Sequence, residues 1–207
     1  MAIAMSEKDI AAAVFYAICY TFGLRVPSEC LTLRFCGTSE VDIAPTDVDG
    51  PSIFVRRKAL HLVYRRTKNE PRGCVIVRYC CCGHCPQICP VHSIASYLLR
   101  LDKGARPFAY TPAAATKELR RRLALCCSKD IDDPAHFSLH AFRRGGAQDL
   151  ASRGAPIHEV LGYGRWRSGA IFKYLSERDL DVEAATHLVS NESDSDCEEL
   201  LQPMGSG

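Results

Sequence analysis

The sequence lacks an apolar run long enough to cross a membrane. Its most apolar stretch, IAAAVFYAICYTFGL at residues 10–24, is bounded by Asp9 and Arg25. A helix that spans a bilayer needs about 20 apolar residues, so this stretch is too short for a span. We therefore expect no membrane partner and predict a buried helix here.

The twelve cysteines lack the setting of a secreted disulfide framework. They occur in clumps such as YCCCGHC at residues 79–85, and no secretory signal sequence precedes them. Disulfide frameworks are typical of small secreted chains, whereas cysteines inside the cell stay reduced. We interpret the chain as an intracellular protein with reduced thiols.

Internal repeats are also missing, and no P-loop spacing surrounds Gly145 and Gly146. These absences exclude a solenoid and a P-loop nucleotide site. With 207 residues, 47% of them hydrophobic, the chain can bury the core of one domain of ordinary size. We place that domain at residues 1–190.

The chain has little net charge, only +2 at neutral pH, but the charge is unevenly distributed. Residues 191–199 hold five acidic side chains, and without them the chain would carry +7. We predict that residues 191–207 form an acidic, disordered tail. The basic remainder suits an anionic partner such as DNA or a merely soluble surface. The run KELRRRLA at residues 117–124 is likewise either a solvated helix face or a phosphate contact.

Periodicity and turn residues predict a mainly α domain with a small antiparallel β-sheet, an α+β fold. Ser6, Asp9 and Gly23 mark the start and end of a first helix, and Pro27 opens a second helix. The stretches 52–66 and 74–80 predict a β-hairpin, with a third strand left open. Further segments with helical spacing are residues 90–101, 115–127, 139–154 and 168–180.

Five short blocks combine basic, polar and aromatic residues in a fixed order. They are GLRVPSE (23–29), TKNEPRG (67–73), LHAFRRGGAQDLASRGA (139–155), LGYGRWRS (161–168) and IFKYL (171–175). Together they resemble the catalytic domain of the tyrosine recombinase (phage integrase) family. The wording of the last three is most similar to recombinases of eukaryotic mobile elements of the crypton and DIRS types. The resemblance covers most of residues 10–180 and implies the recombinase catalytic-domain fold.

The resemblance implies a set of catalytic residues, which carry over onto matching positions of this sequence. They are Arg25, Lys68, His140, Arg143, Trp166 and Tyr174. Lys58 in the same hairpin region competes with Lys68 for the role of the family's hairpin lysine. The commoner family motif has an acidic residue three positions after the first arginine, whereas Glu29 follows Arg25 by four. A helix would still place these two side chains on one face.

The chemistry of DNA strand transfer agrees with these roles. Attack on a phosphodiester needs a nucleophilic oxygen, which Tyr174 supplies, and donors for the non-bridging oxygens, which Arg25 and Arg143 supply. Lys68 can give a proton to the departing 5′ oxygen, since lysine shifts its pKa readily. His140 can donate to the phosphate or move a proton. Trp166 offers an indole N–H and an apolar face that supports the tyrosine segment.

A second constellation lies in the sequence CCCGHCPQICPVH. Cys82, Cys85, Cys89 and His92 have the spacing C-x2-C-x3-C-x2-H, which could hold one structural zinc ion. Cys80, Cys81 and His84 are spare ligands. The alternative interpretation is that these cysteines face the core as small apolar side chains. Recombination itself needs no metal or nucleotide cofactor.

We therefore predict a site-specific recombinase that cuts and rejoins double-stranded DNA through a covalent 3′-phosphotyrosine. The resemblance implies several protomers on DNA, joined through the amphipathic segment 180–190, and location with the DNA, in the nucleus if the host is eukaryotic. The DNA-clamping domain that precedes this one in the family is missing, so we interpret the chain as a fragment or a minimal member. The alternatives are a domesticated domain that binds without cutting and strand relaxation as in type IB topoisomerases.

Overall fold

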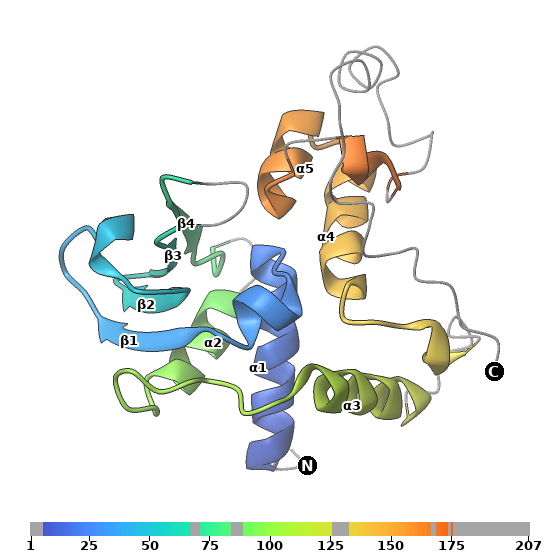
Figure 1. Ribbon diagram of the computed structural model, residues 1–207, viewed down its shortest axis with the longest axis horizontal. Helices are drawn as coiled ribbons and strands as arrows, with labels where there is room; N and C mark the ends of the chain where they lie inside the picture. Colours follow the sequence, from blue (N-terminus) through green and yellow to red (C-terminus); the bar gives the residue numbers. More distant parts are fainter. Residues whose placement is uncertain are drawn as a thin grey trace. The chain divides into compact units, whose positions relative to one another are not determined.

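The structure is a computed structural model of the chain. It describes residues 6–66, 71–83, 89–125, 133–166, 169–173 and 175. The chain divides into two compact units, Met1–Arg143 and Arg144–Gly207. Figure 1 follows the chain by colour, and each unit is described by itself below.

The first helix, α1 (Glu7–Phe22), begins and ends where the sequence predicts. The Ser6 side chain caps it by accepting a hydrogen bond from the backbone N–H of Asp9 at 3.2 Å. Gly23 ends it in the left-handed region, with φ of 58°, a conformation that glycine adopts without strain. Among the described residues, no helix combines the length and the apolar character needed to cross a membrane.

The sheet has four strands in the order β1-β2-β3-β4. The strands are β1 (Arg34–Thr38), β2 (Ser52–Arg56), β3 (Ala59–Tyr64) and β4 (Cys74–Tyr79). Strands β2, β3 and β4 pair antiparallel, which confirms the hairpin and supplies the third strand. The prediction of a wholly antiparallel sheet is wrong at β1, which pairs parallel with β2. A parallel pair needs a long connection, and residues 39–51 provide it.

The segment after Gly23 also differs from its prediction. A single π-helical turn, Val26–Cys30, stands where the sequence predicts a second helix, and the chain then enters β1. Two longer helices follow the sheet, α2 (Pro90–Leu98) and α3 (Pro112–Leu125), both at predicted places. The fold of the described residues is thus mixed α and β, in the α+β class.

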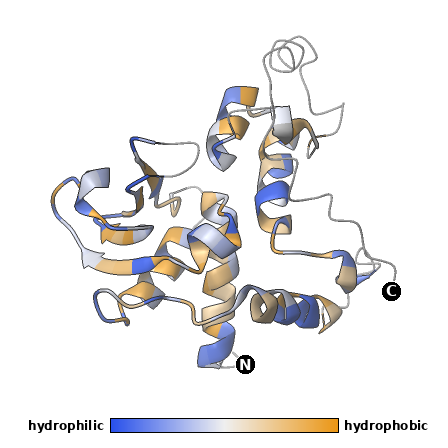
Figure 2. Cartoon of the chain, viewed as in Figure 1, coloured by the Kyte–Doolittle hydropathy of each residue, from blue (hydrophilic) through white to orange (hydrophobic). Residues whose placement is uncertain are grey.

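The core of the first unit lies where α1, α2 and the sheet meet. Its most buried members include Phe15, Ile18, Leu33, Leu60 and Ile94, all at most 1% exposed. Figure 2 shows α1 as mainly hydrophobic beyond its first turn. Burial of these apolar side chains stabilises the fold, which explains why the apolar stretch 10–24 forms a core helix.

The described part of the second unit, which ends at Leu175, contains two α-helices. Helix α4 (Ala141–Ser152) begins in the last residues of the first unit, and α5 (Ile157–Gly164) follows it. Helix α5 is not among the helices predicted from the sequence. Of the helix predicted at 168–180, the structure describes a 3-10 turn, Gly169–Lys173, and a bend at Leu175. The unit has its own cluster of buried side chains: Ala147, Ala151, Val160, Tyr163, Trp166, Ile171 and Leu175.

Two adjacent glycines in α4 make a matched test of this packing. A Cβ atom on Gly146 would lie 1.9 Å from the hydroxyl oxygen of Tyr163, whereas one on Gly145 would have no neighbour within 4 Å. We expect Gly146→Ala to lower the free energy of unfolding by about 1–3 kcal/mol, because overpacking a buried contact forces side chains to shift. Gly145→Ala should raise it by up to about 1 kcal/mol through helix propensity.

Urea unfolding followed by the fluorescence of Trp166, the single tryptophan, measures both changes in the second unit. A Gly146→Ala protein as stable as the unmodified chain would show that α4 and α5 do not pack this closely.

Candidate functional site

Arg25 stands at the start of the π-helical turn and is held there by Glu29. The backbone N–H of Arg25 donates to Oε2 of Glu29 at 2.8 Å, and its Nη1 donates to Oε1 at 3.3 Å. The Glu29 side chain is 5% exposed and that of Arg25 is 28% exposed. The buried Glu29 carboxylate thus holds both the backbone N–H and the guanidinium group of Arg25, whose side chain is still partly exposed to solvent.

The wide turn explains the unusual spacing of this pair. The N–H of Cys30 donates to the carbonyl of Arg25 at 3.3 Å, which closes a turn of the i to i+5 kind. Such a turn holds one residue more than an α-helical turn, and π turns are frequent at functional sites. The prediction that Arg25 and Glu29 lie on one face is confirmed by their ion pair.

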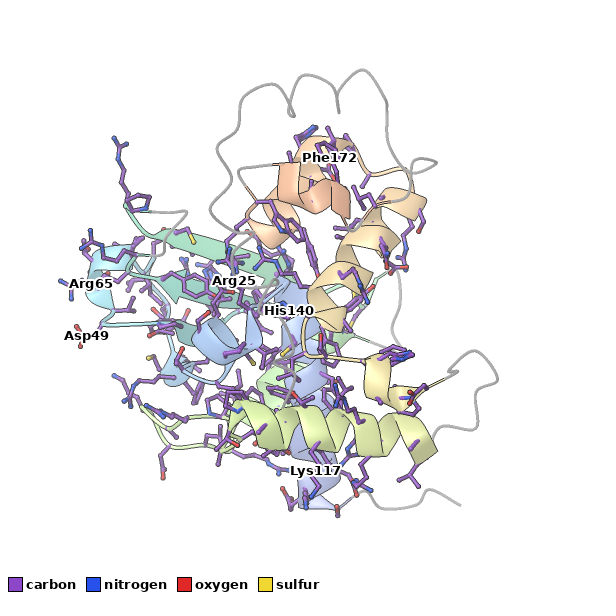
Figure 3. All side chains as sticks on the ribbon, turned by 45° about the vertical axis from the view of Figure 1, so that its right-hand side comes forward. Arg25, Asp49, Arg65, Lys117, His140 and Phe172 are labelled. Atoms are coloured by element: carbon purple, nitrogen blue, oxygen red, sulfur yellow. The ribbon has the colours of Figure 1, made fainter. Side chains whose placement is uncertain are left out.

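A cleft of about 260 Å³ lies beside this turn. Three segments of the first unit line it: the residues that follow Arg25, the first residues of α3 and the residues that precede α4. They include Val26, Pro27, Pro112, Thr116, Leu139 and His140. His140 is exposed, so its imidazole can meet a ligand from solvent. Figure 3 labels both Arg25 and His140.

Arg143 follows His140 by three residues, in the first turn of α4. It is 5% exposed, whereas its neighbour Arg144 is exposed. A guanidinium stays charged in proteins, and burying it is costly unless anionic or acceptor groups surround it. Arg143 is therefore a buried cation, unlike the surface charge of Arg144.

The two candidate lysines belong to opposite ends of strand β3. Lys58 lies in the two-residue turn between β2 and β3, where Arg57 has a φ of 51°. Lys68 lies outside the described residues, in the connector from β3 to β4. Strand β3 is about 17 Å long at about 3.3 Å per residue, which separates the turn of Lys58 from the start of the connector that contains Lys68.

Gly73 is the last residue of the connector that contains Lys68 and directly precedes β4. Its φ is +79°, and a Cβ atom there would lie 2.4 Å from the carbonyl oxygens of Tyr64 and Arg65. Only glycine fits this position without moving backbone. The ends of the connector are thus fixed by the pairing of Tyr64 with Cys74.

Trp166 is buried in the second unit, at 8% exposure, in the same cluster as Ile171 and Leu175. A Cβ atom on Gly164 would lie 1.9 Å from the indole ring, so glycine leaves the space that the ring occupies. Ile171 and Leu175 lie on either side of position 174 in the sequence, and Tyr174 itself lies outside the described residues. The predicted support of the tyrosine segment by Trp166 and its predicted phosphate contact both stay predictions.

The arginines of α3 are engaged within the protein. Arg121 and Arg122 each donate to Glu118 at 2.8 Å, and Arg122 also reaches Asp9 at 2.7 Å. Arg120 donates to the carbonyl of Phe137 at 2.9 Å. The hydrogen bond from Arg121 is the main cause that lowers the pKa of Glu118 to about 2. These contacts favour a structural role for the basic run over a phosphate contact.

The thiol and imidazole cluster brings three of the predicted ligands, Cys82, Cys89 and His92, together with Cys80. The side-chain ligand atoms of Cys80, Cys82, Cys89 and His92 all lie within 4.8 Å of one another, so this group could hold a metal ion. Cys85 lies outside the described residues. The sequence named Cys80 only as a spare, although the C-x-C spacing at a strand end was a usable signal, because alternate residues share a face.

The thiols of this cluster have unequal acidity. The neighbouring Cys80 thiol raises the pKa of Cys82 to about 12. Burial acts to raise the pKa of Cys89, but hydrogen bonds with the backbone N–H groups of His92 and Cys81 and with the thiols of Cys82 and Cys80 together lower that pKa to about 6. A thiolate at Cys89 is therefore favoured at neutral pH, at the N-terminus of α2.

Comparisons with known proteins identify no family for this chain. No family matches the chain in a scan against models of protein families, and no curated protein matches it in a sequence search. The resemblance to the tyrosine recombinases therefore rests on the sequence motifs alone.

Proposed function

We propose that this chain is the catalytic domain of a tyrosine recombinase that breaks and rejoins double-stranded DNA, with the fold of that family. The observation that carries the proposal is the cleft that joins the turn after Arg25 to His140. These residues are more than a hundred positions apart in the sequence and belong to separate motifs of the resemblance. A cleft shared by the residues that directly follow Arg25 and by His140 supports the site that the resemblance implies.

The reaction assigned to the site is a transesterification. The hydroxyl oxygen of Tyr174 attacks phosphorus, the bond to the 5′ oxygen breaks, and a 3′-phosphotyrosine forms. His140 takes the tyrosine proton, and Lys68 gives a proton to the 5′ oxygen. The forked donors of Arg25 and Arg143 stabilise the charge on the non-bridging oxygens. A 5′ hydroxyl of another strand then reverses the steps and rejoins the DNA.

Glu29 has a positioning role in this scheme. Its carboxylate binds both the backbone and the guanidinium of Arg25, so the arginine enters the reaction with few conformations to lose. The net charge of the residues outside the acidic stretch supports DNA as the partner. Strand exchange needs several protomers, and we assign their contact to residues 180–190, outside the described part of the chain.

A nicked suicide substrate tests the function. Cleavage next to the nick releases a short oligonucleotide, so the covalent intermediate cannot be rejoined and accumulates. We expect a protein–DNA adduct on denaturing gels when the substrate contains the flanks of the parent genomic element.

The outcomes separate the alternatives. Adduct together with joined recombinant products supports a recombinase, whereas adduct with relaxed circles alone indicates a topoisomerase. DNA binding with no adduct on any flank would identify a domain that binds without cutting.

A further inference from the structure

The end of β4 and the start of α2 present four soft or borderline metal ligands to one point. Cys80 and Cys82 follow β4, Cys89 immediately precedes α2, and His92 lies in its first turn. The three cysteines are free thiols. Three thiolates and one imidazole form a ligand set typical of structural zinc.

Two of the distances between these atoms are close to those around a tetrahedral ion. Two thiolates on one zinc lie about 3.8 Å apart when each Zn–S bond is about 2.3 Å. The sulfur atoms of Cys80 and Cys89 are 3.8 Å apart, and Sγ of Cys80 is 4.0 Å from Nδ1 of His92. Sγ of Cys82 is 2.9 Å from the same nitrogen, a hydrogen-bond distance that metal binding would lengthen by less than about 1 Å.

The backbone around the cluster is already held in place. The N–H of Cys80 donates to the carbonyl of Lys58 at 2.8 Å, which ties the cluster to the turn between β2 and β3. The N–H of Cys82 points at Sγ of Cys80 at 3.3 Å, an outer contact of the kind that orients thiolate ligands. Val91 and Ile94 anchor α2 in the core at 3% and 0% exposure. The ligands therefore come from two fixed elements.

We propose that this chain binds one structural Zn²⁺ through Cys80, Cys82, Cys89 and His92. Four protein ligands close the coordination sphere, so the ion has no open position for chemistry. Its effect is to staple the end of β4 to the start of α2. Because Cys80 is tied to Lys58, the staple also holds the end of the sheet opposite to the connector of Lys68. Cys85 is not a ligand in this assignment.

Elemental analysis of the full chain, purified with reductant and without chelator, should give about one zinc per chain. Cys80→Ser should weaken zinc binding by more than the roughly 10–100-fold that loss of an outer-shell contact costs. Cys85→Ser is the matched control from the same cysteine-rich segment, and Cys36→Ser is the control on β1. Both should keep the zinc.

Cobalt replacement distinguishes loss of a ligand from loss of the fold. The cobalt-loaded protein should show thiolate-to-cobalt charge-transfer bands and the d–d bands of a tetrahedral site. His92→Cys should keep the metal with stronger charge-transfer bands, because a fourth thiolate joins the ion. Circular dichroism of each variant reports whether helices and sheet persist.

Three results would overturn the assignment. They are a reduced, folded protein without zinc, a Cys80→Ser protein that binds as tightly as the unmodified chain, and loss of zinc in Cys85→Ser. None of these measurements uses DNA, so their failure is separate from failure of the recombinase proposal.

Discussion

Replacement of Tyr174 by phenylalanine should abolish the covalent protein–DNA adduct and leave DNA binding almost unchanged. The substitution removes one oxygen atom, the proposed nucleophile, and keeps the aromatic ring. Binding is governed by phosphate contacts of basic side chains, which the change does not touch. A denaturing gel of the suicide-substrate reaction measures the adduct, and a mobility shift on intact duplex measures binding.

Tyr79→Phe is the matched control for this experiment. Tyr79 ends β4 and is 74% exposed, so removing its hydroxyl should change neither stability nor cleavage. If Tyr174→Phe forms as much adduct as Tyr79→Phe, another side chain is the nucleophile.

The local features of the fold were predictable from the sequence. The first helix, its serine cap and its glycine end depend on residues within a few positions of one another. Strand β1 was missed because its pairing with β2 depends on a partner across residues 39–51. Its own sequence, RFCGT, has neither clear alternation nor a run of β-branched residues. Parallel pairing of this kind is set by tertiary packing.

The candidate site shows the same division. The spacing of Glu29 after Arg25 was visible in the sequence, but the π turn that accommodates this spacing could not be predicted from it. In the metal cluster, Cys82, Cys89 and His92 were chosen correctly as members of a group that could bind metal, and Cys80 was named only as a spare. The C-x-C spacing of Cys80 and Cys82 was a signal for Cys80, but the approach of these thiols to Cys89 and His92 depends on how β4 ends and α2 begins. Tyr174 and Lys68 stay predictions.

Lys68→Ala should cleave ordinary DNA about 10²–10⁴-fold more slowly and should recover when sulfur replaces the bridging 5′ oxygen. The lysine is needed because an alkoxide leaves poorly without a proton. A thiolate leaves without one, since the pKa of a thiol is about 8.5. Single-turnover cleavage of matched oxygen and sulfur substrates measures the rescue.

Arg143→Ala and Lys58→Ala complete the test. Arg143 acts on the non-bridging oxygens, which the sulfur leaves unchanged, so its loss should cost about 3 kcal/mol, or about a hundredfold in rate, on both substrates. Lys58→Ala should cleave both substrates normally, because Lys58 lies at the other end of β3. If the sulfur substrate rescues cleavage by Lys58→Ala and not by Lys68→Ala, the phosphate lies at the end of the sheet next to the metal cluster. The reason is that the N–H of Cys80 donates to the carbonyl of Lys58. Removing zinc would then slow cleavage as well. If the sulfur substrate rescues neither variant, neither lysine is the proton donor, and His140 is the next candidate.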